Sequence, residues 1–274
     1  MRSSGVIGRQ GIQPVAAKDG ISQGNGGNCR GKISVVGIGP GHGVGMTIEA
    51  RQAMEQAAVV AGYHTYLDLV PDLIAGKEVI GSGMMQEVER CEAAVERAKA
   101  GACVAVISSG DPGIYGMAGL VLELVVKLPE ALQPEVRIIP GVSAVGSVAA
   151  ALGAPLMHDF AVISMSDLMT PWEVIEKRVR AAVEADFVIA IYNPKSVKRT
   201  EQIEKVRQIA LQHRKATTPV GVVRSVSRPD QELVITTLDR FTEEKIDMFT
   251  TVIIGNSQTF QSGQFMITPR GYTL

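Results

Sequence analysis

The chain has 274 residues, of which 46% are hydrophobic and 20% are charged, so it can bury a sizeable core and is not disordered throughout. Its 27 Lys and Arg residues nearly balance 28 Asp and Glu residues, and the net charge of −1 gives no electrostatic case for a nucleic-acid or membrane partner. Cys29, Cys91 and Cys103 share no CxxC spacing, and the histidines show no metal-ligand spacing. We therefore expect no metal site, and unpaired thiols in a reducing cytoplasm.

Two stretches bear on how much of the chain folds and on whether it enters a membrane. Residues 1–30 are rich in Gly, Ser, Gln and Asn without any period, which predicts a disordered N-terminal extension that lacks the apolar segment of a signal peptide. The uncharged stretch 138–157 approaches the length of a membrane span. However, Pro140-Gly141 and Gly153-Ala154-Pro155 interrupt it, so it predicts a strand, a turn and a short helix of a soluble protein.

From residue 31 to 153 apolar runs alternate with helical periods, which predicts an N-terminal α/β domain. The expected strands are 33–38, 104–107 and 136–139. The expected helices are 47–59, 86–100, 118–128 and 145–152. The strands are apolar almost without a break, which is typical of a parallel sheet covered on both faces.

Residues 154–274 predict a second α/β domain with some antiparallel pairing. The expected strands are 160–165, 187–192, 220–224, 232–237 and 250–255. A helix should begin near Trp172, another should cover 196–213, and Arg228-Pro229-Asp230 should form a hairpin turn. In such sheets ligands lie outside the carboxyl ends of strands, so the loops that follow strands are the candidate sites.

The first of these loops is Gly37-Ile38-Gly39-Pro40-Gly41-His42-Gly43. It fails the dinucleotide fingerprint because His42 occupies the third glycine position, and because no acidic residue ends the next apolar run, 59–63. Pro40 also lacks the backbone N–H that a phosphate cradle uses. The loop is therefore either a plain tight turn or a ligand-lining loop of another kind.

Two further loops combine glycine, proline and small residues after a strand. The segment 104–116, VAVISSGDPGIYG, predicts a buried strand and a stiff loop with one central carboxylate, Asp111, suited to a ligand with an amino group, a ribose or a cationic centre. The alternative is a structural turn in which Asp111 caps the helix near Met117. The loop Pro140-Gly141-Val142-Ser143-Ala144 allows a ligand to approach the backbone, or else only close helix–sheet packing.

The fourth loop, Ile191-Tyr192-Asn193-Pro194-Lys195-Ser196, leads to Lys198 and Arg199. Tyr192 offers a stacking face with a polar tip, and Pro194 favours an extended Asn193. The cations suit anionic groups of a substrate, or a solvated helix start.

Together these loops resemble the tetrapyrrole methyltransferases. The resemblance rests on VVGIGPG, SSGDPGIYG, PGVSA, IYNP, GVVRSVSR and TTVIIGNS in that order, and it covers about residues 32–260. The stretch 158–176, HDFAVISMSDLMTPWEVIE, with IYNPKSVKR and SVSRPDQ, is most similar to the members that methylate carbon 17 of precorrin-3B or cobalt-factor III.

The resemblance implies two α/β domains with S-adenosylmethionine in the cleft between them, a cytoplasmic homodimer and a role in cobalamin biosynthesis. It places a set of residues from both domains on the cofactor. These are Pro40, Ser109, Gly110, Asp111, Ile114, Ser143, Ala144, Tyr192, Asn193, Val223 and Arg224. Ser109 departs from the glycine that is common in the family, which affects only a detail of loop shape.

The implied reaction is methyl transfer with ring contraction, for which no side-chain nucleophile is expected. Asp111, His158 and Asp167 are candidates for a general acid or base. The carboxylates of a tetrapyrrole substrate should meet cations such as Lys195, Lys198, Arg199, Arg224 and Arg228. The alternatives are methylation of another corrin carbon, an NAD-dependent oxidoreductase, and a non-catalytic tetrapyrrole-binding protein; the sequence does not decide whether the substrate contains cobalt.

Overall fold

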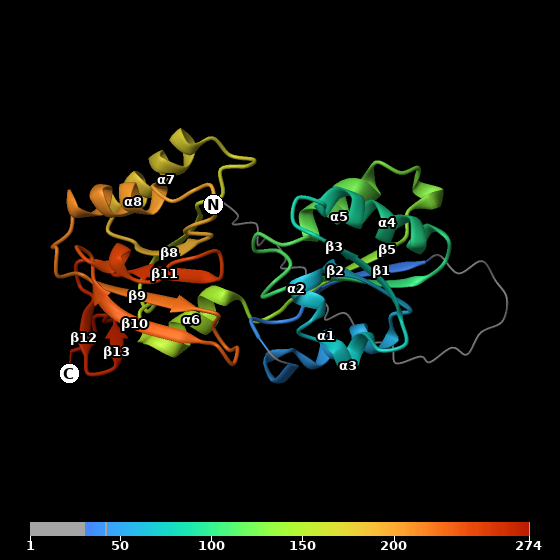
Figure 1. The fold of residues 1–274 in the computed structure, drawn as a ribbon, viewed down its shortest axis with the longest axis horizontal. Coiled ribbons are helices and arrows are strands. Elements are labelled where there is room, and N and C mark those ends of the chain that lie inside the picture. The colour runs from blue at the N-terminus through green and yellow to red at the C-terminus, as the bar shows by residue number, and fades with distance from the viewer. Residues whose placement is uncertain (1–30, 42, 274) are drawn as a thin grey trace, which may run out of the picture.

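The computed structural model describes residues 31–41 and 43–273, so the disorder expected for residues 1–30 lies outside the described residues. Two five-stranded sheets lie at opposite ends of the molecule, each with helices packed against it (Figure 1). This arrangement confirms the predicted α/β class.

The first sheet is entirely parallel, in the order β3-β2-β4-β1-β5. Its strands are β1 Lys32–Gly37, β2 Val59–Tyr63, β3 Glu78–Ser82, β4 Cys103–Ser108 and β5 Glu135–Ile139. Gly37 pairs with Ser108, and Val36 pairs with Ile139. The three neighbouring strands β1, β4 and β5 therefore end at one level, so the loops that follow them start side by side.

Helices cover both faces of this sheet, as its apolar strands require (Figure 1). One face packs against α4 Glu87–Lys99 and α5 Ala118–Val126, and the other against α1 Ile48–Gln56, α2 His64–Leu67 and α3 Pro71–Ile74. Short 3₁₀ turns occupy Gly43–Gly45 and Glu130–Leu132. Helix α1 begins where the Thr47 side chain accepts a hydrogen bond from the Ala50 N–H at 3.1 Å.

The second sheet is mixed, in the order β10-β9-β11-β8-β7. Its strands are β7 Phe160–Ser164, β8 Val188–Tyr192, β9 Pro219–Arg224, β10 Glu232–Thr237 and β11 Thr250–Ile254. Only β7 and β8 are parallel. Strand β9 pairs antiparallel with β10 in a hairpin whose last residue pair before the turn is Arg224 and Glu232. The antiparallel pairing and the hairpin turn predicted for this half are confirmed.

Helices α7 Trp172–Glu184 and α8 Gln202–Leu211 cover one face of the second sheet, with a 3₁₀ turn at Phe241–Glu243. Helix α6 Ala144–Leu152 covers the other face, beside a small sheet of β6 Gly153–Ala154, β12 Phe260–Ser262 and β13 Phe265–Ile267. Val148 and Leu152 of α6 are fully buried against this second core. We therefore propose that the boundary between the domains lies near residue 140, before α6, rather than at 153.

Several predicted elements have different bounds in the structure. The helix predicted for 47–59 ends at Gln56, because the apolar residues from Val59 form the buried strand β2. The helix predicted for 196–213 begins only at Gln202, because residues 193–199 form a loop closed by the Ser196 and Arg199 backbones. The strands β2, β3, β6, β12 and β13 and the short helices α2 and α3 were not predicted.

Candidate functional site

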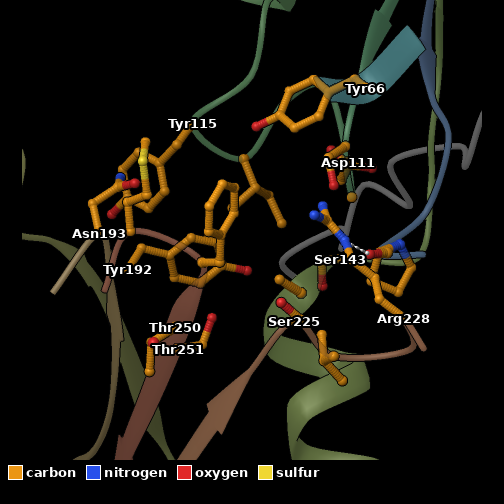
Figure 2. Close-up of a pocket in the computed structure, with 18 residues that line it drawn as sticks. Tyr66, Asp111, Tyr115, Ser143, Tyr192, Asn193, Ser225, Arg228, Thr250 and Thr251 are labelled. Carbon is orange, nitrogen blue, oxygen red and sulfur yellow. Dashed lines mark hydrogen bonds between the residues drawn. The ribbon is translucent and has the colours of Figure 1, made fainter. Parts of the chain in front are cut away.

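A cavity, called the main cavity below, lies between the two sheets (Figure 2). The loops after β1, β4 and β5 form one wall, with Tyr66 of α2 beside them. The ends of β8, β9 and β11 form the other. The lining residues are Pro40, Tyr66, Ser109, Gly110, Asp111, Ile114, Tyr115, Ser143, Ala144, Tyr192, Asn193, Ser225, Val226, Arg228, Met248, Phe249, Thr250 and Thr251.

Backbone packed on backbone builds the first wall. Gly39 and Gly110 exchange hydrogen bonds, from the Gly110 N–H to the Gly39 oxygen at 2.7 Å and from the Gly39 N–H to the Gly110 oxygen at 3.2 Å. Gly110 has a φ of +67°, which favours glycine. A Cβ on Gly141 would lie 2.1 Å from the Gly110 oxygen, so glycine is required there for the loops to approach. The first wall is therefore stiff, and it presents its main chain to a ligand.

Asp111 joins two loops of this wall. Its Oδ1 accepts from the Gly113 N–H at 2.8 Å, and its Oδ2 accepts from the Gly141 N–H at 3.1 Å. No side chain caps α5, whose N-cap residue is Met117; the Ser108 hydroxyl accepts from the Met117 N–H at 3.2 Å. The alternative in which Asp111 caps this helix is therefore wrong, and Asp111 both lines the cavity and fixes the loop after β5.

Side chains build the second wall. The Tyr192 hydroxyl accepts from the Val145 N–H at 2.8 Å and thereby ties the end of β8 to the first turn of α6. Strand β11 runs antiparallel to β8 and β9, so its first residues, Thr250 and Thr251, lie at the edge where β8 and β9 end. Ser225 follows β9 with a φ of +49°, a conformation that turns the chain sharply at the cavity.

Two contacts cross from one wall to the other. The Arg228 Nε donates to the Pro40 oxygen at 3.3 Å, drawn as a dashed line in Figure 2. The Tyr115 hydroxyl donates to the Val162 oxygen of β7 at 3.0 Å, and its ring lies 5.4 Å from the Tyr192 ring between centroids. These contacts hold the two halves together on either side of the cavity.

Three phenols of the cavity have a raised pKa. Burial is the main cause for Tyr66, Tyr115 and Tyr192, because a phenolate would lose its hydration there. The Val145 N–H opposes the effect at Tyr192, since it stabilises a phenolate. These hydroxyls are therefore neutral at physiological pH. The Tyr115 hydroxyl donates to the Val162 oxygen, whereas those of Tyr66 and Tyr192 can donate to a ligand.

Nine of the eleven predicted cofactor residues line the main cavity, from Pro40 in the loop after β1 to Asn193 after β8. Val223 and Arg224 do not. Val223 is buried in the core beneath α6. Arg224 is held by carboxylates outside the cavity, with its Nε 2.7 Å from the Asp247 Oδ2. The residues immediately after them, Ser225 and Val226, take these places.

Of the predicted substrate cations, Arg228 lines the main cavity and Lys195, Lys198 and Arg199 do not. Arg199 is buried, with its Nη1 3.3 Å from the Asp167 Oδ1 and its Nη2 2.6 Å from the Asn193 oxygen. The pair Arg199–Asp167 thus supports the Asn193 loop and is occupied internally. His158 lines a separate cavity, so of the three candidate acids or bases only Asp111 reaches the main cavity.

Eight lining residues were not predicted. Tyr115, Ser225, Val226, Thr250 and Thr251 stand inside or beside the motifs that carry the resemblance, which is the signal that could have found them. The other three are Tyr66, Met248 and Phe249. Within residues 31–41 and 43–273 no group of three or more His, Cys, Asp or Glu side chains could hold a metal ion, and no helix is long and apolar enough to cross a bilayer.

The chain is similar to known proteins over most of its length. The family model described as Tetrapyrrole (Corrin/Porphyrin) Methylases matches residues 32–242. A probable cobalt-factor III C(17)-methyltransferase of Salmonella typhimurium is 54% identical over 242 residues, which are 88% of this chain and 100% of that protein. A cobalt-factor III methyltransferase of Priestia megaterium is 49% identical over 245 residues, which are 89% of this chain but only 45% of that longer protein.

Solved structures agree with the fold. The methyltransferase CobJ has a TM-score of 0.82 and 36% identity, with 87% of this chain and 100% of that chain covered. A uroporphyrin-III C-methyltransferase of Thermus thermophilus, solved with S-adenosylhomocysteine, has a TM-score of 0.63 and 23% identity, with 82% of this chain and 92% of that chain covered. That second likeness shows the fold alone.

Proposed function

The chain belongs to the tetrapyrrole (corrin/porphyrin) methylase family, and from that premise we propose that it transfers a methyl group from S-adenosylmethionine to carbon 17 of a corrin precursor. The substrate is precorrin-3B or cobalt-factor III, ring contraction accompanies the transfer, and the step belongs to cobalamin biosynthesis. The observation that carries the proposal is the full-length match to the Salmonella relative at 54% identity. Because the chain belongs to this family, we do not propose that it is an NAD-dependent oxidoreductase.

The first wall supports the cofactor assignment. Its loops expose main chain at Gly110 and small side chains at Ser143 and Ala144, which suits close approach of an amino acid and a nucleoside. Asp111 adds one carboxylate to this wall, a counter-charge for a ligand with a cationic centre or a ribose. When bound, S-adenosylmethionine supplies an activated methyl group on a sulfonium.

The residues of this chain then need mainly to align the methyl group with the substrate carbon and to exclude water from the cavity. The stiff first wall fixes one reactant, and the contacts of Tyr115 and Arg228 across the cavity hold the second wall against it. Such orientation and water exclusion can lower a barrier by as much as about 7–11 kcal/mol. We assign no nucleophilic side chain. We assign Arg228 to a substrate carboxylate, because it lines the cavity and its Nη atoms are not used in the contact with Pro40.

We also propose a cytoplasmic homodimer. Leu168, Met169 and Val197 are largely exposed on two loops that the Asp167–Arg199 ion pair joins. An apolar group of this kind on a folded surface favours a protein interface. The free thiols of Cys91 and Cys103 suit a reducing compartment. Light scattering should give a dimer for the wild type and a monomer for the double variant Met169→Glu and Val197→Glu; an unchanged mass would contradict this interface.

The activity is tested by incubating the protein with methyl-labelled S-adenosylmethionine and either cobalt-factor III or precorrin-3B. We expect the label in one of the two tetrapyrroles, which also decides whether cobalt is already present. Binding of both ligands without transfer of label would contradict the proposal and favour the non-catalytic alternative.

A further inference from the structure

A second cavity adjoins the main one and contains a buried cation. This side cavity lies at the carboxyl ends of β2, β3 and β4. It shares six lining residues with the main cavity, which are Tyr66, Ser109, Tyr115, Asn193, Met248 and Phe249. Arg90 of α4 lines it, although only 4% of that residue is exposed. Of the residues that we assign to the cofactor, Ser109 and Asn193 line both cavities, whereas Asp111, Ser143 and Ala144 line only the main one.

Arg90 lacks the counter-charge that the other buried arginines have. Arg199 lies 3.3 Å from the Asp167 carboxylate, and Arg214 lies 4.0 Å from that of Asp186. Within the described part of the chain, no carboxylate oxygen lies within 4.0 Å of Arg90. Its guanidinium has only neutral partners, which are the Ser82 hydroxyl, the Gly83 oxygen at 3.5 Å and the Met117 sulfur at 3.7 Å.

A buried guanidinium without an anion is costly, so such a group calls for an explanation. Its Nε has no hydrogen-bond partner among the described residues, as is also true of Arg199 and Arg214, so the missing ion pair is what distinguishes Arg90. Glu87 is the one carboxylate that lines the side cavity, but its Oε1 accepts from the Met85 N–H at 3.2 Å. Among the described residues the Arg90 guanidinium therefore has no direct ion pair.

Tyr66 places a second polar group beside the same space. Its hydroxyl makes no hydrogen bond to any described residue, and Tyr66 lines both cavities. Figure 2 shows its ring on the side of the first wall with the hydroxyl toward the interior. Burial raises the pKa of this phenol, while Arg228 and Arg90 oppose the shift, so both cations act on it electrostatically. A neutral donor and a guanidinium without a direct ion pair thus line the same cavity.

We propose that the side cavity is a carboxylate subsite, in which Arg90 and Tyr66 bind an acidic side chain of the tetrapyrrole substrate. Arginine suits this role because its planar donors match a carboxylate. The inference rests on the proposed function for the identity of the ligand. The carboxylate of the cofactor is the other source of the same chemistry. Asp111, Ser143 and Ala144 are absent from the lining of the side cavity, which favours the substrate, and the titration with S-adenosylhomocysteine separates the two sources.

The test measures binding of uroporphyrin III, a stable tetrapyrrole rich in carboxylates, to the full chain by fluorescence titration. Arg90→Met keeps much of the side-chain volume and removes the charge. We expect it to weaken uroporphyrin binding by about 10-fold or more, and to change the dissociation constant of S-adenosylhomocysteine by less than about twofold. Because the cation has no anionic partner in the free protein, the melting temperature should not fall.

Arg97→Gln on the same helix is the matched control, since Arg97 is half exposed and pairs with Glu78 outside both cavities. It should leave both affinities unchanged. Arg90→Lys should bind uroporphyrin more tightly than Arg90→Met, because it keeps the positive charge. Tyr66→Phe should also weaken uroporphyrin binding, and it tests the subsite if Arg90→Met fails to fold.

Three results would overturn the subsite. They are unchanged uroporphyrin binding in Arg90→Met and Tyr66→Phe, a loss confined to S-adenosylhomocysteine, and no uroporphyrin binding by the wild type. The titration requires no methyl transfer. Its failure is therefore distinguishable from failure of the proposed reaction, which the labelling experiment tests separately.

Discussion

Both walls of the main cavity line the candidate ligand site, but the first does so with main-chain atoms and the second with side chains. The first wall consists of main chain held by main chain, with Gly110 and Gly141 in contact at the ends of parallel strands. The second wall consists of side chains such as Tyr192 and Arg228 at the edge of a mixed sheet. The difference predicts that substitutions in the first wall destroy the site, whereas those in the second wall adjust it.

The largest effect is expected from Gly141→Ala. The new Cβ would lie 2.1 Å from the Gly110 oxygen, so one loop must move. We expect the free energy of unfolding to fall by about 3 kcal/mol and binding of S-adenosylhomocysteine to be lost. Denaturant titration and calorimetry measure these two quantities.

Gly119→Ala is the matched control. Gly119 lies in α5, and a Cβ there would meet nothing within 4 Å. This variant should gain about 0.5–1 kcal/mol and bind normally. Normal binding by Gly141→Ala would show that the first wall is not the rigid element described above.

A smaller effect is expected from Asp111→Ala, which removes the acceptor shared by the Gly113 and Gly141 N–H groups. Hydrogen bonds to a charged group contribute about 1.5–3 kcal/mol, so the unfolding free energy should fall by that order. Asp111→Asn keeps one acceptor and should lie between this variant and the wild type in both stability and cofactor affinity. Equal stability of all three proteins would contradict the bridging role.

In the second wall, Tyr192→Phe removes the acceptor of the Val145 N–H but keeps the ring. We expect a loss of about 1 kcal/mol in stability, with binding of S-adenosylhomocysteine weakened but measurable. Tyr272→Phe, at an exposed position, should change neither quantity. A loss as large as that of Gly141→Ala would erase the distinction between the walls.

The smallest effect concerns pH. The raised pKa values of Tyr66, Tyr115 and Tyr192 mean that the neutral phenol is favoured in the folded protein. Their contribution to stability is fully present below the unfolded pKa of about 10 and is lost as the pH rises through the folded values. An ultraviolet difference titration of wild type against Tyr192→Phe should show this phenol ionising above about pH 10. Ionisation below that range would contradict the burial argument.

The sequence reveals the first wall better than the second for a physical reason. A loop that follows a parallel strand is marked by glycine and small residues, and this rule located Ser109, Asp111 and Ser143. The rule fails for β11, because its antiparallel direction brings the residues before the strand, Met248 and Phe249, to the cavity. Pairing direction is a tertiary property that the sequence of one strand does not carry.

The sequence predicted the loops that line the cavity better than the arginines that are available to a ligand. Arg199 and Arg224 form ion pairs with carboxylates of the protein, whereas Arg90 has no carboxylate oxygen within 4.0 Å among the described residues, and the sequence does not distinguish the three. Tyr66 was missed because no element was predicted between the helices 47–59 and 86–100, a stretch that holds β2, α2, α3 and β3. Which cation is free, and which run is a strand, depends on packing between distant segments.

The most direct test of the central claim is the position of the transferred methyl group. Carbon-13 NMR of the product formed from labelled S-adenosylmethionine should place the label on carbon 17 of a ring-contracted macrocycle. A label on any other carbon would contradict the assignment while leaving the chain a methyltransferase of its family.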